Sequence, residues 1–527
     1  MGLMFIVLCL FPVLLLYLYV RLNDAKIMRL PHDVASAFSP KRVSTKDAWE
    51  AAEAWEKVTT TLNAKTFLPP RTGRRYIVVG GVGLVGTHYE ARSLKSLSFQ
   101  AGFLGGWIVR HLLERGEHPK RIRVLDIRTP TRPDLTSGLA NDVDFHQVDV
   151  SDREQVQAAF STPWPRDGSE DPSAAEITVF HTAANIRFYE RDPRLLHLSD
   201  KVNVEGTRNV LAAACATGAS ILIYTSSGSV SLRRTRLWLW PWEQRPEFVV
   251  QAFNDNSRLP TRPEEMFSNY AVSKLKAERL VREADRTLSG CGRVQGQQRL
   301  LRTGCLRPGN GIYGPGGDIL CGAYLVRQVN PSWAQDTLQN FIYVENASLA
   351  HFCYERRLIE KAQGSLNPDI GGQAFCIVDD GPPVTYGDVY TVLTTLTDGR
   401  TVFPRLPATT MLMVAYVFEW LHVARSLMVS SSSPVLRYLA RVIPAPNGDL
   451  INLQPSLFFL TMAHLIWDDS RARASPENGG LGYEPQWTTL SGLCKLVEEH
   501  NRAEGRFETR SMIGGISFGF RWRAAER

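Results

Sequence analysis

Three side chains that can carry out proton transfer stand out in the sequence: a hydroxyl at Ser227, a phenol at Tyr270 and an amine at Lys274. Tyr270 and Lys274 lie four residues apart in the stretch 268–281, which contains no Gly or Pro and suits a helix. Residues four apart share a helix face, so the ammonium group would lie beside the phenol. A nearby positive charge favours the phenolate, so we expect a lowered Tyr270 pKa and a general acid/base role. An ordinary surface helix is the alternative.

Apolar strand patterns alternate with helical patterns around this stretch. We expect strands at 74–81, 122–126, 144–150, 177–184 and 221–227. Strands rich in apolar and β-branched residues that alternate with helices predict a parallel, doubly wound α/β sheet of the Rossmann type. In such sheets the ligand binds beyond the carboxyl ends of the strands, and Ser227 falls at one of those ends.

Two glycine-rich turns follow the first predicted strand. Residues 81–86 fit the pattern G-x-G-x-x-G, and residues 102–105 form a second glycine turn. Only the second turn precedes a helical stripe and a strand that ends in an acid, Asp126, about 20 residues after Gly105 as a ribose contact requires. The turn would let a pyrophosphate approach backbone N–H groups. Asp126 favours NAD over NADP, while Arg128 keeps NADP open.

Residues 82–100 interrupt this pattern. Their removal would join Gly81 to Ala101 and leave one continuous glycine turn. Their coding length is a multiple of three, and Val82 and Gln100 at the two ends allow the borders of an intron. We therefore interpret 82–100 as a retained intron, with a genuine surface insertion as the alternative. Sequencing the transcript distinguishes the two.

The N-terminal stretch 3–20 carries no charged residue. As a helix it would be about 27 Å long, just enough to span a bilayer. Arg21, Lys26 and Arg29 follow it, which favours a cytoplasmic location for the body of the protein. No basic region precedes the stretch and no small-residue cleavage site follows it, so we expect an uncleaved anchor. A buried N-terminal helix is the alternative.

Composition limits the remaining classes of function. The 527 residues carry a formal charge of +7, and the basic residues are scattered, so nucleic acid is not an expected partner. The eight cysteines form no C-x-x-C pair, which favours reduced thiols facing the cytosol over disulfides or a zinc site. We expect no metal.

Three further apolar stretches could touch a membrane or an apolar substrate. Residues 233–242 combine Arg and Trp, as is typical of a membrane interface or the entry to an apolar pocket. Residues 410–428 are apolar but contain Glu419, His422 and Arg425, so an amphipathic surface helix fits better than a spanning one. Residues 451–467 look similar. Packing inside the protein is the alternative for all three stretches.

Taken together, these motifs resemble the extended short-chain dehydrogenase/reductases over about residues 75–355. Within them the chain is most similar to the 3β-hydroxysteroid dehydrogenase/isomerase family, in particular to its decarboxylating sterol-4α-carboxylate 3-dehydrogenases. The resemblance rests on the glycine turn, Asp126, and the segments 181–184, 203–209, 224–227, 270–274 and 307–316.

The resemblance implies specific roles. Tyr270 is the acid/base, Lys274 lowers its pKa and holds the nicotinamide ribose, and Ser227 bonds the substrate oxygen. The dinucleotide, NAD or alternatively NADP, would contact Gly80, Gly81, Gly102, Phe103, Leu104, Gly105, Asp126, Asp149, Val150, Ala183, Ala184, Asn203, Tyr270, Lys274, Pro308 and Gly309.

These expectations divide the chain into five parts. They are a transmembrane anchor (1–25), a polar linker with one helix at 47–58 (26–73), a Rossmann domain (74–355), a smaller substrate and membrane-associated lobe (356–505) and a tail (506–527). The resemblance also implies a location at the endoplasmic reticulum membrane, and a homodimer or an assembly with other membrane-bound sterol enzymes.

The expected activity is oxidation of a 3β-hydroxyl group on a sterol, steroid or triterpenoid, with or without decarboxylation at C4. Three alternatives stay open. They are an added isomerase activity in the same site, action on another apolar metabolite, and a non-catalytic NAD-binding scaffold at the membrane.

Overall fold

The computed structural model of the protein describes residues 2–58, 64–80, 101–130, 132–168, 176–290, 299–442 and 448–502. Gly81, the stretch 82–100 and the tail 506–527, on which several expectations fall, lie outside the described residues.

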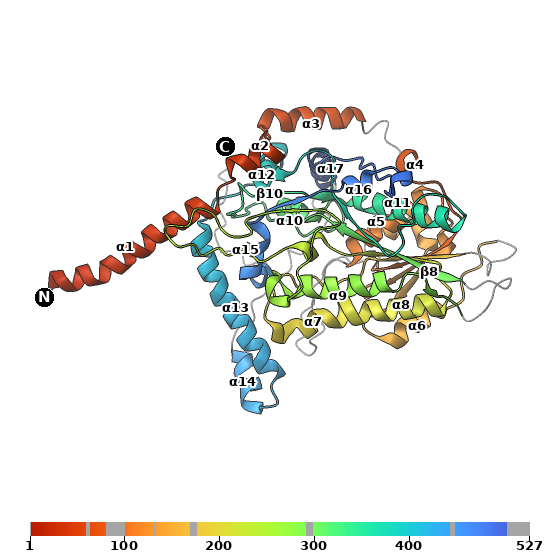
Figure 1. The fold of residues 1–527 in the computed structure, drawn as a ribbon, viewed down its shortest axis with the longest axis horizontal. Helices are drawn as coiled ribbons and strands as arrows, with labels where there is room; N and C mark the ends of the chain where they lie inside the picture. Colours follow the sequence, from red (N-terminus) through yellow and green to blue (C-terminus); the bar gives the residue numbers. More distant parts are fainter. Residues whose placement is uncertain are drawn as a thin grey trace.

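A parallel sheet forms the centre of the molecule (Figure 1). Its main strands are β1 (Arg75–Val79), β2 (Ile122–Asp126), β3 (Asp144–Gln147), β4 (Ile177–His181), β5 (Ile221–Thr225), β8 (Leu300–Pro308) and β12 (Ala374–Ile377). They lie in the order β12-β8-β5-β4-β1-β2-β3, and each neighbouring pair is parallel. The short β7 (Thr287–Leu288) pairs antiparallel with β8. The strand order reverses between β1 and β4, so the predicted Rossmann-type sheet is confirmed.

Helices cover both faces of this sheet, because alternate residues of each strand point to opposite faces. Tyr76 and Val78 of β1 pack against α5 (Ala101–Glu114) and α11 (Val344–Ala362). Ile77 and Val79 pack with α6 (Arg153–Ser161), α8 (Gly206–Ala216) and α9 (Asn269–Glu283). The short α7 (Leu196–Asp200) precedes α8.

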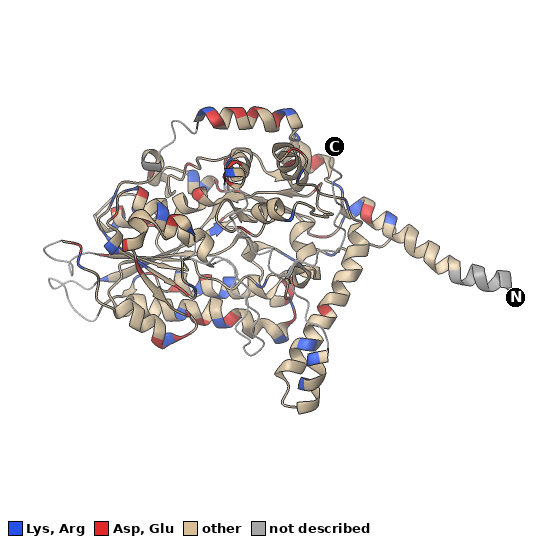
Figure 2. Cartoon of the chain, turned by 180° about the vertical axis from the view of Figure 1, so that it is seen from behind, with Lys and Arg blue, Asp and Glu red and all other residues tan. Residues whose placement is uncertain are grey.

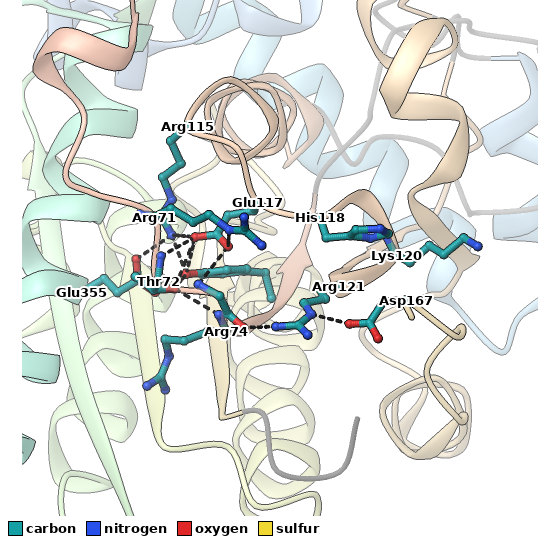
Figure 3. A network of polar contacts seen from close by, with 12 residues as sticks. Arg71, Thr72, Arg74, Arg115, Glu117, His118, Lys120, Arg121, Asp167 and Glu355 are labelled. Atoms are coloured by element: carbon teal, nitrogen blue, oxygen red, sulfur yellow. Dashed lines mark hydrogen bonds and ion pairs between the residues drawn. The ribbon is translucent and has the colours of Figure 1, made fainter. Parts of the chain in front are cut away.

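A buried polar network closes the amino edge of the sheet (Figure 3). The Arg115 guanidinium, at the end of α5, lies 3.1 Å from the carboxylate of Glu117 and 3.2 Å from that of Glu355 on α11. The other oxygen of Glu355 accepts a 2.9 Å hydrogen bond from Thr178 of β4. The network therefore ties both helices to the sheet at the edge opposite the carboxyl ends of the strands.

A second lobe surrounds a four-stranded sheet in the order β13-β10-β14-β6. Its strands are β6 (Val250–Phe253), β10 (Leu338–Gln339), β13 (Val384–Thr385) and β14 (His464–Trp467), and a separate pair comprises β9 (Ile312–Tyr313) and β11 (Ile342–Tyr343). Its helices are α10 (Cys321–Arg327), α12 (Tyr386–Leu396), α13 (Ala408–Ser430), α14 (Pro434–Val442), α15 (Pro455–Thr461), α16 (Ser470–Arg473) and α17 (Thr489–Arg502). The expectation of an amphipathic helix at 451–467 is wrong for the second half of that stretch. There His464–Trp467 form β14, which pairs with β6 and β10.

The region expected to be a linker is largely folded. After α1 (Gly2–Ile27), it contains α2 (His32–Phe38), α3 (Thr45–Val58) and α4 (Ala64–Phe67), so the helix expected at 47–58 is present. Trp55 of α3 donates a 2.7 Å hydrogen bond to Glu498 of α17, and its ring lies 4.9 Å from that of Trp487. A linker would lack such contacts. The local sequence pattern does not predict them, because Glu498 and Trp487 lie more than 400 residues from Trp55 in the chain.

The helix α1 projects from the body, and its base contacts the base of α13 (Figure 1). The Asp24 carboxylate accepts a 2.7 Å hydrogen bond from the Thr409 backbone, and the Asn23 amide donates to the Thr409 hydroxyl. Within the part of the chain that the structure describes, α13 is the helix whose length and composition suit a membrane crossing. A spanning role for 3–20 is therefore not supported by this criterion.

Candidate active site

The predicted site residues that the structure describes gather at the carboxyl edge of the central sheet. Gly80, Asp126, Asp149, Ala183, Ser227 and Pro308 follow or end β1, β2, β3, β4, β5 and β8 in turn. Parallel strands place their carboxyl ends at one edge, which is why residues far apart in the sequence meet here.

Gly80 turns the chain sharply at the end of β1. Its φ angle is 91°, in the region that favours glycine, and its N–H donates a 2.7 Å hydrogen bond to the Leu125 carbonyl. The Thr182 hydroxyl lies 3.0 Å from the carbonyls of both Val79 and Gly80. The turn is therefore held from β2 and β4.

The second glycine turn differs from the expectation. Gly102 and Gly105 lie in the first turns of α5, which begins at Ala101, and not in a loop before it. Phe103 and Leu104 are buried in the core against the sheet, so their side chains do not line a ligand site. Phe103, Leu104 and Trp107 of α5 all pack inward.

Acidic residues follow β2 and β3 as predicted. Asp126 is buried, and its Oδ1 accepts a 3.2 Å hydrogen bond from the Arg128 N–H. Asp149 accepts hydrogen bonds from the backbone and the hydroxyl of Ser151, which stabilises the turn into α6. Val150 packs on Gly206, where an added Cβ would lie 2.9 Å from the Val150 side chain.

The end of β4 is fixed by a reciprocal pair of asparagines. Asn203 accepts a 2.7 Å hydrogen bond from the Asn185 N–H and donates one of 3.1 Å to the Asn185 carbonyl. Asn203 lies in a π-helical turn, Lys201–Glu205, just before α8. Such turns are frequent at functional sites, and here the turn holds the buried small residues Ala183 and Ala184 at the sheet edge.

The start of α9 is capped from two directions. Ser268 accepts a hydrogen bond from the Ala271 N–H as the helix N-cap. The Asn269 N–H donates to the Glu190 carbonyl and its side-chain amide donates to the Asp192 carbonyl, both at 2.7 Å. Tyr270, the next residue, is therefore placed by the segment 187–194.

The pKa values of Tyr270 and Lys274 differ from the expectation. Burial raises the pKa of Tyr270 to about 12, while the side chain of Ser227 acts in the opposite direction. Burial lowers the pKa of Lys274 to about 7, and its ammonium donates a 2.6 Å hydrogen bond to the Thr225 carbonyl. The expected lowering of the Tyr270 pKa by Lys274 is wrong in this structure, because desolvation dominates and the ammonium points at β5.

A buried ion pair supports the end of β5. Glu278 of α9 accepts a 2.6 Å hydrogen bond from the Ser226 hydroxyl and is bound by the Arg307 guanidinium of β8. Ser226 precedes Ser227, so this network fixes the backbone that carries the expected substrate-binding hydroxyl.

Close backbone approach explains two glycines of the site. A Cβ on Gly228 would lie 2.7 Å from the Pro308 carbonyl, and a Cβ on Gly309 would lie 2.8 Å from the Asn340 carbonyl. The loop after β5 therefore packs against the end of β8, and the loop after β8 packs against the segment between β10 and β11.

The described residues fit a nicotinamide dinucleotide. Asn185 Oδ1 is buried at the end of β4 and has no hydrogen-bond partner among the described residues, so it is available to a ligand. Lys274 and Tyr270 lie on one face of α9 beside β5, and Asp126 ends β2. The phosphate turn itself includes Gly81, outside the described residues.

Sequence reasoning missed Asn185, Glu190 and Glu278 as parts of the site. Asn185 follows Ala183 and Ala184 directly, so its position after a strand with small terminal residues was a usable signal. Glu190 and Glu278 act through contacts between distant elements, for which the sequence gives no signal.

A cavity of about 510 Å³ adjoins the start of α9. Its lining comes from the segment 191–196, from Arg234, from the loop 263–269 and from Tyr416, Glu419, Trp420 and Val423 of α13. It lies between the catalytic helix and α13.

The fold and the Ser-Tyr-Lys site define an extended short-chain dehydrogenase/reductase. The model of the 3-beta hydroxysteroid dehydrogenase/isomerase family matches residues 100–402, and the chain belongs to this family.

Relatives in the family are found in animals, plants and fungi. The chain is 32% identical to a mouse 3 beta-hydroxysteroid dehydrogenase type 7 over 298 residues, 54% of this chain and 68% of that protein. It is 26% identical to isoform 1 of an Arabidopsis thaliana 3beta-hydroxysteroid-dehydrogenase/decarboxylase over 423 residues, 77% of this chain and 80% of that one. It is 27% identical to the decarboxylating sterol-4-alpha-carboxylate 3-dehydrogenase of Schizosaccharomyces pombe over 284 residues, 53% and 68% of the two chains.

Family membership and site together make the protein an NAD(P)-dependent oxidoreductase.

Proposed function

We propose that the protein oxidises the 3β-hydroxyl group of a sterol, steroid or triterpenoid to a 3-ketone with NAD, with NADP as the alternative cofactor. The observation that carries the proposal is the meeting of Ser227, Tyr270 and Lys274 at the carboxyl edge of the sheet. The matched family and the names of the relatives support the substrate class.

Tyr270 carries out the proton transfer. The Ser227 hydroxyl orients the substrate oxygen, and the Tyr270 phenolate accepts the proton of the 3-hydroxyl. A bound oxidised nicotinamide supplies the acceptor for the hydride of the carbinol carbon. Lys274 and Asn185 would hold the dinucleotide, and the buried position of Tyr270 keeps bulk water from its oxygen.

A carboxylate at C4 of the substrate would leave as CO₂ after this oxidation. The bond between C4 and the carboxyl carbon breaks, its electron pair forms the enolate of the new 3-ketone, and a proton then adds at C4. The step needs no further oxidant, so the same site residues serve a substrate with or without the carboxylate.

We further propose that the protein is bound to a membrane. The large apolar side chains between Leu10 and Leu18 of α1 are exposed, and charge is confined to the base of that helix (Figure 2). Trp240 and Trp242 are exposed and stacked at 5.2 Å, next to the base of α1, where Lys26 binds the carbonyls of Pro241 and Glu243. Exposed aromatic residues are typical of a membrane interface.

Within this proposal α13 lies on the bilayer surface. Its charged side chains are bound to the body: Glu419 pairs with Arg191 at 2.6 and 2.7 Å, and His422 contacts Glu190 at 2.8 Å. Val417 and Trp420, and Val435 and Val442 of the following α14, are exposed. A helix held to the protein by these pairs suits an interfacial position better than a crossing. We propose the cytoplasmic face of the endoplasmic reticulum membrane as its location.

The test is spectroscopic turnover of NAD to NADH by the full chain in mixed micelles. Substrates are a 3β-hydroxysteroid and its 4α-carboxylated analogue, with Tyr270→Phe as the inactive control. Reduction of NAD that depends on Tyr270, with formation of the 3-ketone, supports the proposal. Cofactor binding without turnover would point to a different alcohol or to a non-catalytic NAD-binding scaffold, and absence of cofactor binding would contradict both the proposal and that scaffold.

A further inference from the structure

Glu190, in the loop between β4 and α7, contacts two helices with different atoms. Its backbone carbonyl accepts a 2.7 Å hydrogen bond from the N–H of Asn269, the residue before Tyr270 on α9. Its carboxylate lies 2.8 Å from Nε2 of His422 on α13. A single residue therefore joins α13 to the first turn of the helix that carries Tyr270 and Lys274.

The carboxylate of Glu190 is buried and firmly held. The residue is 1% exposed, and Arg187 donates from Nε and Nη2 to its two oxygens. Burial alone would raise the pKa of Glu190, but the hydrogen bonds from Arg187 and His422 outweigh it, and the pKa is lowered overall. The carboxylate is therefore charged at neutral pH, and separating it from one of its partners is costly.

The residues after Glu190 repeat this arrangement. Arg191 binds both carboxylate oxygens of Glu419 on α13, at 2.6 and 2.7 Å. The Asp192 carbonyl accepts a 2.7 Å hydrogen bond from the side-chain amide of Asn269. Side chains of this loop thus hold α13 while its carbonyls hold Asn269, so a shift of α13 is transmitted to the start of α9.

We propose that Glu190 is a positioning residue through which α13 fixes the place of Tyr270. Glu190 acts through Asn269, and not by contact with the reacting atoms. Its position sets the first turn of α9, from which the Tyr270 phenol meets Ser227. This inference rests on the proposed oxidation and adds to it a dependence of turnover on the attachment of α13.

The test compares Glu190→Gln with Glu355→Gln as the matched control. Both glutamates are 1% exposed and are bound by an arginine and a second donor, but Glu355 belongs to the network at the amino edge of the sheet. His422→Phe removes the contact from α13 and keeps a ring beside Tyr189. His422→Gln retains an amide that can donate to Glu190. All variants are made in the full chain and measured in the same micelles.

We expect Glu190→Gln to lower kcat roughly 10- to 100-fold, because a displacement of about 1 Å in an active site costs about 100-fold. KM and the Kd for NADH should change little. His422→Phe should lower kcat less, since Arg187 still holds Glu190, and His422→Gln should recover most of that loss. Glu355→Gln should lower thermal stability without lowering kcat.

Hydrogen exchange of the backbone amides of 269–274, followed by mass spectrometry without substrate, reports on the start of α9 independently of turnover. We expect faster exchange there in Glu190→Gln and His422→Phe, and exchange as in the wild type in Glu355→Gln. An unchanged kcat in Glu190→Gln, or equal losses of kcat in Glu190→Gln and Glu355→Gln, overturns the proposal. If Glu190→Gln does not fold, His422→Phe and its recovery in His422→Gln decide in its place.

Two results separate this inference from the proposed function. If the wild type oxidises the sterols and kcat does not depend on Glu190, the proposed function stands and this inference fails. If the wild type oxidises neither sterol, the proposed function fails, and the exchange at 269–274 decides on Glu190. Exchange as slow in Glu190→Gln and His422→Phe as in the wild type would then overturn the inference.

Discussion

At the scale of single residues, the site depends on a tyrosine whose burial opposes its ionisation. The fold places Tyr270 beside Ser227, but desolvation raises its pKa to about 12 instead of lowering it. At neutral pH the phenol therefore predominates, and the phenolate that accepts the substrate proton is a minor fraction of the protein.

Removal of the Tyr270 hydroxyl should abolish turnover without unfolding the protein. General acid/base catalysis contributes roughly 100- to 10,000-fold, so we expect Tyr270→Phe to lower kcat by that factor. The measurement is NADH formation, with NAD(H) binding and thermal unfolding as checks. Tyr390→Phe is the matched control, because it removes a buried hydroxyl that bonds Ser332 in the second lobe. Comparable losses in both variants would contradict the assignment.

The pH dependence follows from the raised pKa of Tyr270. Below about pH 12 the phenol predominates, so each unit of increasing pH raises the phenolate fraction about tenfold. We expect kcat/KM for alcohol oxidation to rise with pH from 7 to 9, measured at saturating NAD. A rate that is already constant from pH 7 upward would contradict a Tyr270 pKa above 10.

At the scale of elements, α9 is held to β5 and β8 by the pair of Glu278 and Arg307. Burial alone would raise the pKa of Glu278, but the Arg307 and Ser226 hydrogen bonds outweigh it, and the pKa is lowered overall. Removing one partner leaves the other charge buried without compensation.

We expect Glu278→Gln to lower the free energy of unfolding by roughly 3–5 kcal/mol at pH 7. Because the native pKa of Glu278 is depressed, its stabilisation is complete above the ordinary glutamate pKa of about 4.3 and is lost as the pH falls below it. Urea unfolding at pH 7 and pH 4 measures both effects. Glu283→Gln, exposed on the same helix, is the control and should change stability little.

The connection between β1 and α5 is the second prediction at this scale. Connections from strand to helix in α/β units usually contain about two to six residues, whereas β1 ends at Val79 and α5 begins at Ala101. We expect a chain without residues 82–100 to fold and to bind NADH at least as tightly as the full chain. Thermal unfolding and NADH fluorescence test this expectation. A deletion variant that fails to bind, beside a full chain that binds, would make the stretch a genuine part of the protein.

At the scale of the whole molecule, exposed apolar side chains gather on the projecting part of α1 (Leu10–Leu18), on α13 (Val414, Val417 and Trp420) and on the loop of Trp240 and Trp242. This distribution supports the proposed membrane face next to the cavity; from that face an apolar substrate would reach the site without crossing water.

We expect the double variant Trp240→Ser/Trp242→Ser to bind lipid vesicles roughly tenfold more weakly, since each ring loses burial in the interface. Flotation with neutral vesicles measures the partition. Trp49→Ser is the control, because Trp49 is similarly exposed but lies on α3. Equal partition of the double variant and the wild type would contradict a membrane role for this loop.

The sequence by itself determined the parallel sheet, the location of the ligand edge and the shared face of Tyr270 and Lys274. These follow from local rules: the alternation of apolar strands with helices, the glycine turn, and the helical repeat of 3.6 residues.

Only the tertiary structure decided the packing of α3 on α17, the strand at His464–Trp467, the direction of the Tyr270 pKa and the cavity beside Arg234. Each of these depends on contacts between residues distant in the sequence or on burial, and both arise only when the elements pack together.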